Sequence, residues 1–302
     1  MKILITGGAG YIGTELITAL NANKEVDSII VYDNLSRKNF NFFTNGTLGN
    51  KVRFVEGDLL DSRKLRQSIK DVDVVFHLGA LTDKNPSLDS HLFEQVNHWG
   101  TSELMNAVEE SKASRIIYTS STAVFGGGET IFNEESDPNP KTFYATSKWR
   151  GEEQVKRLFN KIKCYNIRIG NVYGFGSSTR YDGVINKFMF DANFKGRISI
   201  HGNGRQMRSF ISLQSVIAAL VKLLDFNLES GTYNLTDKNL QVLDIVEVLQ
   251  EIYPALEFIF INQHIKIEDL QVERDGKLMK MLNLPTSDLK QELEKFKSKF
   301  SF

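Results

Sequence analysis

The strongest constraint on the fold of this chain lies in its first 20 residues. Lys2 to Thr6 has the composition of a buried strand and runs directly into the glycine-rich turn Gly7-Gly8-Ala9-Gly10-Tyr11-Ile12-Gly13. A helical pattern follows through Leu16 and Leu20. Glycines between a strand and a helix permit a tight turn and let the backbone approach a pyrophosphate at the positive end of the helix. The segment therefore predicts a dinucleotide-binding unit.

A second predicted strand, Ser28 to Tyr32, ends at Asp33, 20 residues after Gly13. A carboxylate at this position accepts hydrogen bonds from the adenosine ribose and repels a 2′-phosphate, which indicates NAD rather than NADP. Arg37 and Lys38 remain a possible 2′-phosphate site, so the alternative stays open. The residues of these two segments that we expect to contact the cofactor are Gly7, Gly10, Tyr11, Ile12, Gly13, Asp33 and Asn34.

Strand and helix patterns alternate over the first half of the chain. The expected strands are 2–6, 28–32, 51–55, 72–76, 115–119 and 164–169, and the longest expected helices are 88–111 and 143–159. This alternation predicts an α/β fold with a doubly wound parallel sheet, in which ligands bind at the carboxyl ends of the strands. Leu78 and Ala80 follow one such end.

Beyond about residue 170 the alternation loosens. We expect residues 1–169 to form the NAD-binding Rossmann domain and residues 170–302 a smaller, mixed α/β substrate lobe, some of whose strands and helices return to the first domain. The charged tail from Ser287 to Lys299 has the spacing of an amphipathic helix with Leu289, Leu293 and Phe296 inward.

Composition limits the possible partners and compartment. The 302 residues are 41% apolar and 25% charged, which is typical of a soluble globular protein. Lys plus Arg (37) equals Asp plus Glu (37), so nothing indicates a nucleic acid or a membrane surface as partner. The single cysteine, Cys164, excludes an internal disulfide, and no cluster has metal-ligand spacing. The longest strongly apolar stretch is too short to span a bilayer, so we expect a cytoplasmic protein.

Tyr144 and Lys148 are four residues apart in the segment Tyr-Ala-Thr-Ser-Lys. On a helix, positions i and i+4 share one face, so the phenol and the ammonium project into the same space. A nearby cation favours the phenolate and lowers the pKa of the tyrosine. The pair is therefore a candidate general base that works near neutral pH.

Nine short segments along the chain follow one known order of motifs. They are TGGAGYIG (6–13), DNLS (33–36), GDLLD (57–61), VFHLGA (75–80), VNHWGT (96–101), YTSSTAVFG (118–126), YATSK (144–148), RIGNVYG (168–174) and GNGRQMRSFISL (202–213). In these segments, and over nearly its whole length, the chain resembles an extended short-chain dehydrogenase/reductase of the nucleotide-sugar epimerase/dehydratase type.

The resemblance implies a role for residues near the cofactor. Asp58 would bond the adenine amino group, Leu59 would flank the adenine ring, and Asn97 would tie backbone or ordered water near the active site. Lys148 would hold the nicotinamide ribose, and Ser121 would relay a proton between Tyr144 and a sugar hydroxyl.

It also implies where the substrate binds. Asn171 and Arg208 fall where the family contacts the substrate diphosphate, and arginine suits that task because its planar fork binds phosphate oxygens in pairs. Arg180, in a Gly/Ser-rich loop, and Thr122, beside Ser121, are further candidates. His77 is interpreted as a hydrogen-bonded core residue.

The same resemblance indicates the reaction. Family dehydratases carry an Asp-Glu pair directly after the catalytic Thr, and family decarboxylases carry a glutamate at the second of these places. Thr122 and Ala123 stand there in this chain. We therefore favour an NAD-dependent nucleotide-sugar 4-epimerase acting through a 4-keto intermediate, with a UDP-hexose as substrate. Two alternatives stay open: a reductase of nucleotide 4-keto-sugars, and a dinucleotide-sensing protein without catalysis.

The helices expected at 88–111 and 143–159 match those that pair as a four-helix bundle in family dimers, so we expect a homodimer. Phe125 departs from the family pattern, which often has tyrosine there.

Overall fold

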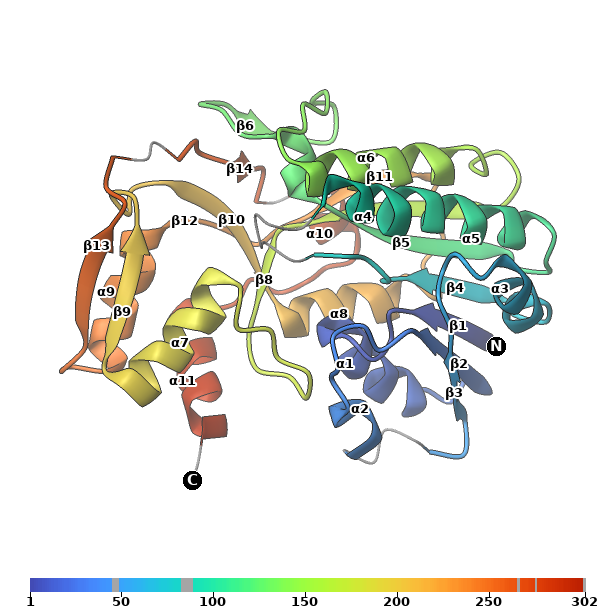
Figure 1. The fold of residues 1–302 in the computed structure, drawn as a ribbon, viewed down its shortest axis with the longest axis horizontal. Helices are drawn as coiled ribbons and strands as arrows, with labels where there is room; N and C mark the ends of the chain where they lie inside the picture. Colours follow the sequence, from blue (N-terminus) through green and yellow to red (C-terminus); the bar gives the residue numbers. More distant parts are fainter. Residues whose placement is uncertain (45–48, 83–88, 265–266, 275, 301–302) are drawn as a thin grey trace.

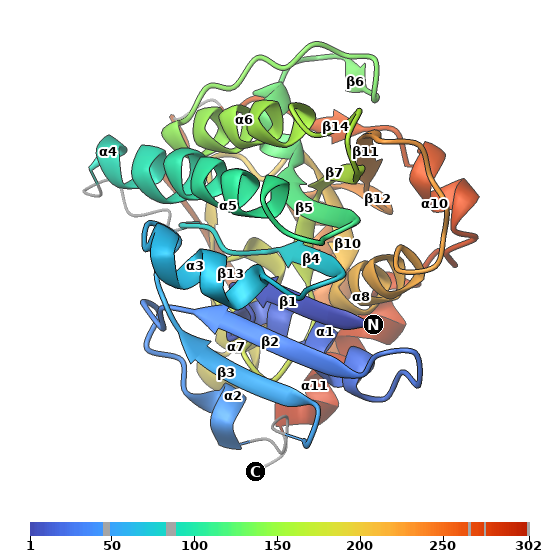
Figure 2. The ribbon, with the colours of Figure 1, turned by 90° about the vertical axis from the view of Figure 1, so that its right-hand side faces the viewer.

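The computed structural model describes residues 1–44, 49–82, 89–264, 267–274 and 276–300. Its centre is a seven-stranded parallel sheet in the order β11-β7-β5-β4-β1-β2-β3 (Figures 1 and 2). The strands are β1 (Lys2–Thr6), β2 (Ser28–Asp33), β3 (Val52–Glu56), β4 (Val74–His77), β5 (Arg115–Ser121), β7 (Lys163–Ile169) and β11 (Gly231–Leu235). The doubly wound sheet predicted from the sequence is confirmed, with strand boundaries shifted by at most two residues.

Helices cover both faces of this sheet (Figure 2). One apolar cluster joins the sheet to helices on one face, and a second joins it to helices on the other. The first face carries α1 (Tyr11–Asn21), α8 (Leu213–Lys222) and α10 (Lys277–Met281), and the second carries α3 (Ser62–Ile69), α5 (Gly100–Glu109) and α6 (Phe143–Lys156). The carboxyl ends of the strands therefore form one edge, framed by helices of both layers.

Strand β11 pairs with β7 in parallel register, so a segment from beyond residue 170, where some strands were expected to return to the first domain, completes the large sheet. One helix of the sheet layer differs in detail from the sequence expectation. The helix expected from Leu88 to Ser111 is divided into α4 (Ser90–Phe93), a π-helical turn (Glu94–Trp99) and α5, while Leu88 lies outside the described residues. Hydropathy does not reveal such a turn, because the apolar spacing barely changes across it.

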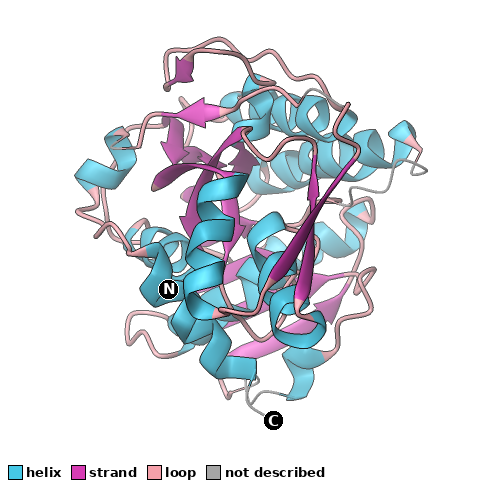
Figure 3. Cartoon of the chain, turned by 90° about the vertical axis from the view of Figure 1, so that its left-hand side faces the viewer, coloured by secondary structure: helices cyan, strands magenta, loops and turns pink. Residues whose placement is uncertain are grey.

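The smaller lobe lies beside the carboxyl ends of the strands (Figures 1 and 3). It contains a three-stranded sheet, a two-stranded parallel sheet and three helices around one apolar cluster. The strands are β8 (Asn171–Tyr173), β10 (Met207–Ser212), β12 (Lys238–Gln241), β9 (Arg197–His201) and β13 (Glu257–Ile261), and the helices are α7 (Val184–Lys195), α9 (Val242–Ile252) and α11 (Leu289–Lys297).

Helix α11 confirms the amphipathic tail predicted from the sequence, because Leu289, Leu293 and Phe296 are its buried residues. The remaining elements are short: α2 (Asn41–Thr44), 3-10 turns at Thr122–Phe125 and Ser298–Phe300, and the paired strands β6 (Ile131–Phe132) and β14 (Gln271–Val272). In the described ranges no helix has both the length and the apolar character needed to cross a bilayer.

Candidate active site

The glycine turn joins the carboxyl end of β1 to the amino end of α1. Gly7 adopts a left-handed φ of 67°, and a Cβ on it would lie 2.6 Å from the Gly79 backbone. A Cβ on Gly13 would lie 2.5 Å from the Gly8 carbonyl oxygen. Bare backbone at the start of a helix is a cradle for a pyrophosphate, so the residues present fit a dinucleotide.

Asp33 ends β2 beside this turn. Its Oδ2 accepts a hydrogen bond from the Ala9 amide at 3.0 Å and its Oδ1 accepts one from the Leu35 amide at 2.8 Å. Burial raises the pKa of Asp33, while these hydrogen bonds and the Arg37 charge act in the opposite direction. Since each carboxylate oxygen has a second lone pair, the held carboxylate can still accept ribose hydroxyls.

The residues expected at the adenine end come directly after the neighbouring strand, β3. Asp58 follows β3, is exposed, and accepts a hydrogen bond from Asn34 Nδ2 at 2.9 Å. Leu59 is buried, and a Cβ on Gly100 would lie 2.9 Å from its Cβ. The structure thus brings the Asn34 and Asp58 side chains together, while Leu59 packs against the start of α5.

Tyr11 contributes more than backbone to the turn. Its buried hydroxyl donates to the Gly174 carbonyl at 2.5 Å and accepts from Asn186 Nδ2 at 3.2 Å. The Asn186 amide also donates to the Arg180 carbonyl at 2.9 Å. Tyr11 therefore links the glycine turn to the loop that carries Arg180, a role that the sequence pattern does not show.

Ser121 and Tyr144 meet at the end of β5. Ser121 is the last residue of β5, and Tyr144 lies in the first turn of α6. Burial raises the pKa of Tyr144, whereas the nearby Ser121 hydroxyl and the charges of Arg180 and Arg37 lower it in part.

Lys148 corrects one prediction from the sequence. Its ammonium lies 4.2 Å from the centre of the Tyr118 ring, and it is not among the groups that lower the pKa of Tyr144. Burial lowers the pKa of Lys148 itself to about 7. The spacing argument counted the attraction between a cation and a phenolate but left out desolvation, which disfavours both charged forms.

Asn97 lies in the π-helical turn and bonds two parts of the site. Its Oδ1 accepts from the Leu81 amide at 2.7 Å, and its Nδ2 donates to the Leu81 carbonyl at 3.0 Å. The same Nδ2 donates to Ser147 Oγ at 3.0 Å. Asn97 therefore ties the backbone of the loop after β4 to α6. In that loop Leu78 and Ala80 are partly buried beside the glycine turn.

His77 is fully buried and occupies a polar chain beneath this site. Its Nδ1 lies 2.7 Å from Thr6 Oγ1 and its Nε2 lies 2.9 Å from Thr101 Oγ1. Burial, followed by the charge of Lys148, holds the pKa of His77 well below its usual value. The interpretation of His77 as a hydrogen-bonded core residue is confirmed.

A buried ion pair joins α6 to the central sheet. Glu152, one turn after Lys148, accepts hydrogen bonds from Arg168 at 3.0 and 2.8 Å and from Ser120 Oγ at 2.5 Å. All three residues are at most 5% exposed. Glu152 lies on α6, Arg168 on β7 and Ser120 on β5. Their contacts therefore fix the position of α6, with Tyr144 and Lys148, relative to the end of β5 that carries Ser121. Sequence reasoning missed it, because nothing marks Glu152 as inward-facing except its spacing from Lys148.

The expected substrate residues lie apart and have partners of their own. Thr122 is buried beside Ser121, and Asn171 is exposed and donates to the Ser209 carbonyl at 3.0 Å. Arg208 donates to the carbonyls of Met207 and Glu268 at 2.7 and 2.5 Å. Of this set, only Thr122 is placed next to the Ser121–Tyr144 pair by these contacts.

Arg180 is held by an acidic residue that the sequence analysis did not single out. Its guanidinium donates two hydrogen bonds to Asp182, at 2.8 and 2.6 Å. Burial opposes ionisation of Asp182, but the Arg180 contacts lower the pKa of Asp182 overall. Arg180 also lowers the pKa of Tyr144, so its charge acts on the phenol.

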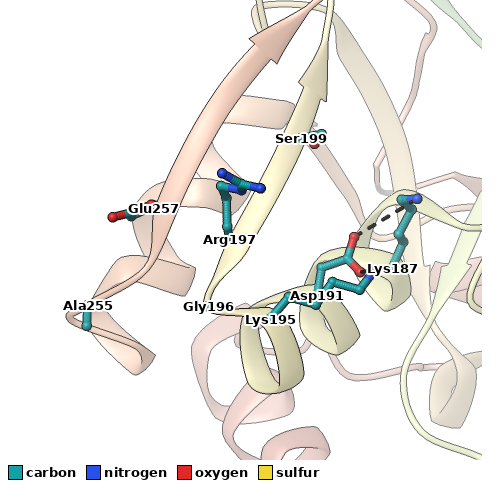
Figure 4. Close-up of a pocket in the computed structure, with 8 residues that line it drawn as sticks. All are labelled: Lys187, Asp191, Lys195, Gly196, Arg197, Ser199, Ala255 and Glu257. Carbon is teal, nitrogen blue, oxygen red and sulfur yellow. Dashed lines mark ion pairs between the residues drawn. The ribbon is translucent and has the colours of Figure 1, made fainter.

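A hollow of about 540 Å³ lies elsewhere, between α7 and the β9–β13 sheet (Figure 4). Its lining is charged, and Asp191 pairs there with Lys195 at 2.7 Å and with Lys187 at 4.0 Å. It contains none of the residues indicated by the sequence. Within the described ranges, no group of three or more His, Cys, Asp or Glu side chains is arranged to hold a metal.

The chain matches the model of the NAD dependent epimerase/dehydratase family over residues 3–236. It is 32% identical over 262 residues to dTDP-D-glucose 4,6-dehydratase of Bos taurus, covering 82% of this chain and 72% of that protein. It is 29% identical over 245 residues to ADP-L-glycero-D-manno-heptose-6-epimerase of Cupriavidus pinatubonensis, covering 78% of this chain and 72% of the relative.

Among solved structures, UDP-glucuronic acid 4-epimerase from Bacillus cereus, in complex with UDP-glucuronic acid and NAD, has a TM-score of 0.88 with 25% identity. The superposition covers 99% of this chain and 98% of that one. The cofactor predicted from the glycine turn and Asp33 is confirmed as NAD. With its parallel sheet, its glycine turn and its matched Tyr144 and Lys148 segment, this chain belongs to the NAD-dependent epimerase/dehydratase family of extended short-chain dehydrogenase/reductases.

Proposed function

We propose that this chain is a nucleotide-sugar 4-epimerase that acts through a transient 4-keto sugar, with a UDP-hexose as substrate. The observation that carries the proposal is the placement of Tyr144, in the first turn of α6, close enough to Ser121, at the end of β5, for the Ser121 hydroxyl to lower the pKa of the phenol, with Thr122 and Ala123 following Ser121. A threonine hydroxyl and a methyl group do not supply the carboxylic acid and carboxylate that eliminate water in the dehydratases.

In this proposal Tyr144 removes the proton from the C4 hydroxyl and later returns it. Bound NAD supplies the acceptor, and then the donor, of the C4 hydride. Ser121 relays the proton, because its hydroxyl lies near enough to the phenol to lower the pKa of Tyr144. The guanidinium groups of Arg180 and Arg37 stabilise the phenolate and offset part of the cost of burying it.

The glycine turn, Asp33, Asn34 and Asp58 would hold the adenosine half of the cofactor, and Lys148 would hold the nicotinamide ribose. The substrate diphosphate would be bound by Arg208 and Asn171, with Arg180 nearer the sugar. Arg208 would then exchange its carbonyl partners for phosphate oxygens, which form stronger, charge-assisted hydrogen bonds.

The relatives include 4,6-dehydratases, so elimination is the activity to test against epimerisation. Purified protein would be incubated with UDP-glucose, UDP-galactose or dTDP-glucose, without added cofactor, and followed by proton NMR. We expect UDP-glucose and UDP-galactose to interconvert. A 4-keto-6-deoxy product would establish a dehydratase instead, and reduction of a 4-keto sugar only with added NADH or NADPH would establish a reductase.

Tyr144→Phe tests the role of the phenol. We expect the rate to fall by about 10²- to 10⁴-fold, the usual contribution of a general acid or base. Ser121→Ala should lower the rate less, because a water molecule can replace a hydroxyl relay. A Tyr144→Phe protein with unchanged rate and unchanged fold would contradict the assignment.

We also propose a homodimer formed through α5 and α6. Trp99 is 55% exposed beside these helices. The outer surface of the same layer carries ion pairs within one chain, such as Arg150 with Glu94 at 2.6 Å. Light scattering that gives the mass of one chain would contradict the dimer.

A further inference from the structure

Arg37 reaches across the cofactor edge of the sheet. It follows β2, and its Nη2 donates to Oγ1 of Thr82, which follows β4, at 2.5 Å. In the sheet, β1 lies between β2 and β4. The side chain therefore crosses in front of the carboxyl end of β1, where the glycine turn begins.

The charge of Arg37 acts on both ends of the cofactor site. Burial raises the pKa of Asp33, and Arg37 is among the groups that lower it. Burial also raises the pKa of Tyr144, and Arg37 again acts in the opposite direction. Asp33 marks the ribose end and Tyr144 the reacting end, so the charge of the guanidinium acts on both ends of the site.

We propose that Arg37 is a cofactor-retaining residue whose guanidinium binds the diphosphate of NAD. The glycine turn offers this diphosphate only neutral amides and the positive end of α1, whereas a guanidinium adds a full charge and paired donors. In the structure Thr82 accepts a hydrogen bond from this guanidinium. Binding of NAD exchanges that neutral acceptor for phosphate oxygens, and release of NAD has to break the ionic contact.

The geometry argues against the other task considered for Arg37, holding a 2′-phosphate. Asp33 lies on the β2 side of the glycine turn, and the contact with Thr82 draws the guanidinium toward the β4 side. The charge is thus directed to the middle of a dinucleotide and away from the adenosine ribose.

Arg37→Gln tests this assignment, with Lys38→Gln as the matched control that removes the neighbouring exposed charge. Calorimetry on nucleotide-free protein would give the Kd of NAD, NADP, ADP-ribose and adenosine, of which only adenosine lacks the diphosphate. For Arg37→Gln we expect binding of NAD and ADP-ribose to weaken by about 10- to 100-fold, the usual value of a hydrogen bond to a charged group. Adenosine binding should not change.

Three further results are expected. NAD should be released from Arg37→Gln faster by a similar factor. The Kd of NAD for Arg37→Lys should lie between the values for Arg37→Gln and the wild type. The Kd of NAD for Lys38→Gln should equal that of the wild type. Unchanged NAD binding by Arg37→Gln would overturn the proposal. Equal weakening of adenosine, or a loss confined to NADP, would overturn it as well. None of these measurements depends on which sugar the enzyme converts.

Discussion

The layer beneath α6 and the core of the smaller lobe are both fully buried, yet they are built from different chemistry. Beneath α6, the Glu152 carboxylate accepts hydrogen bonds from Arg168, and the Lys148 ammonium lies over the Tyr118 ring. In the lobe, residues such as Leu249 and Leu293 pack without polar partners. Directional contacts fix the orientation of catalytic groups, whereas apolar packing stabilises a lobe without setting any one angle.

The largest effect on stability should come from breaking the polar layer. Arg168→Met leaves the Glu152 carboxylate buried without its cation, so we expect unfolding to be easier by about 3–5 kcal/mol in denaturant titrations. The catalytic rate should fall as well, because α6 loses its tie to β5 and β7. Adding Glu152→Gln removes the stranded charge and should restore much of the stability. A stable, fully active Arg168→Met protein would contradict this account of the layer.

A matched change in the apolar core should separate stability from activity. Leu249 of α9 is fully buried, and Leu249→Ala should cost about 2–5 kcal/mol through lost burial and a residual cavity. The rate per folded molecule should stay close to that of the wild type at a temperature where both are folded. If the rate fell as far as in Arg168→Met, the contrast between the two regions would fail.

The pH dependence of stability tests the burial of Lys148. Burial lowers its pKa to about 7 in the folded protein, whereas an unfolded chain keeps the proton up to about 10.4. Between these values the unfolded state binds more protons, so folding stability contributed by this group rises with pH. The stability of the wild type relative to Lys148→Met, measured without cofactor, should increase by on the order of 2 kcal/mol from pH 7 to pH 9. If the stability difference between the wild type and Lys148→Met stayed constant or fell as the pH rose, the lowered pKa of Lys148 would be contradicted.

The smallest effect is expected on the outer surface of the lobe. Ile259 in β13 is 43% exposed, and Ile259→Thr keeps the β-branched shape that suits a strand. We expect the stability to change by less than about 0.5 kcal/mol and the rate not to change. A large loss would mean that β13 is covered in solution.

The sheet could be predicted from the sequence because buried parallel strands appear as short apolar runs, as in Lys2–Thr6 and Arg115–Ser121. Strand β11 (Gly231–Leu235) could not, since its sequence GTYNL lacks such a run. The glycine turn and Asp33 were predictable because their chemistry depends on local spacing. The partners of Glu152, Arg37 and Arg180 were not, because their contacts with Arg168 and Thr82 join distant strands and the Arg180–Asp182 pair depends on how one loop folds.

Transfer of a single hydride out of and back to C4 is the central claim, and isotope retention tests it most directly. UDP-glucose carrying deuterium at C4 would be incubated with the purified protein without added cofactor, and the products would be examined by NMR. We expect the product to be UDP-galactose, in which C4 is inverted and still carries the deuterium. Loss of the deuterium to solvent, its appearance at C6, or recovery of unchanged UDP-glucose would contradict the claim.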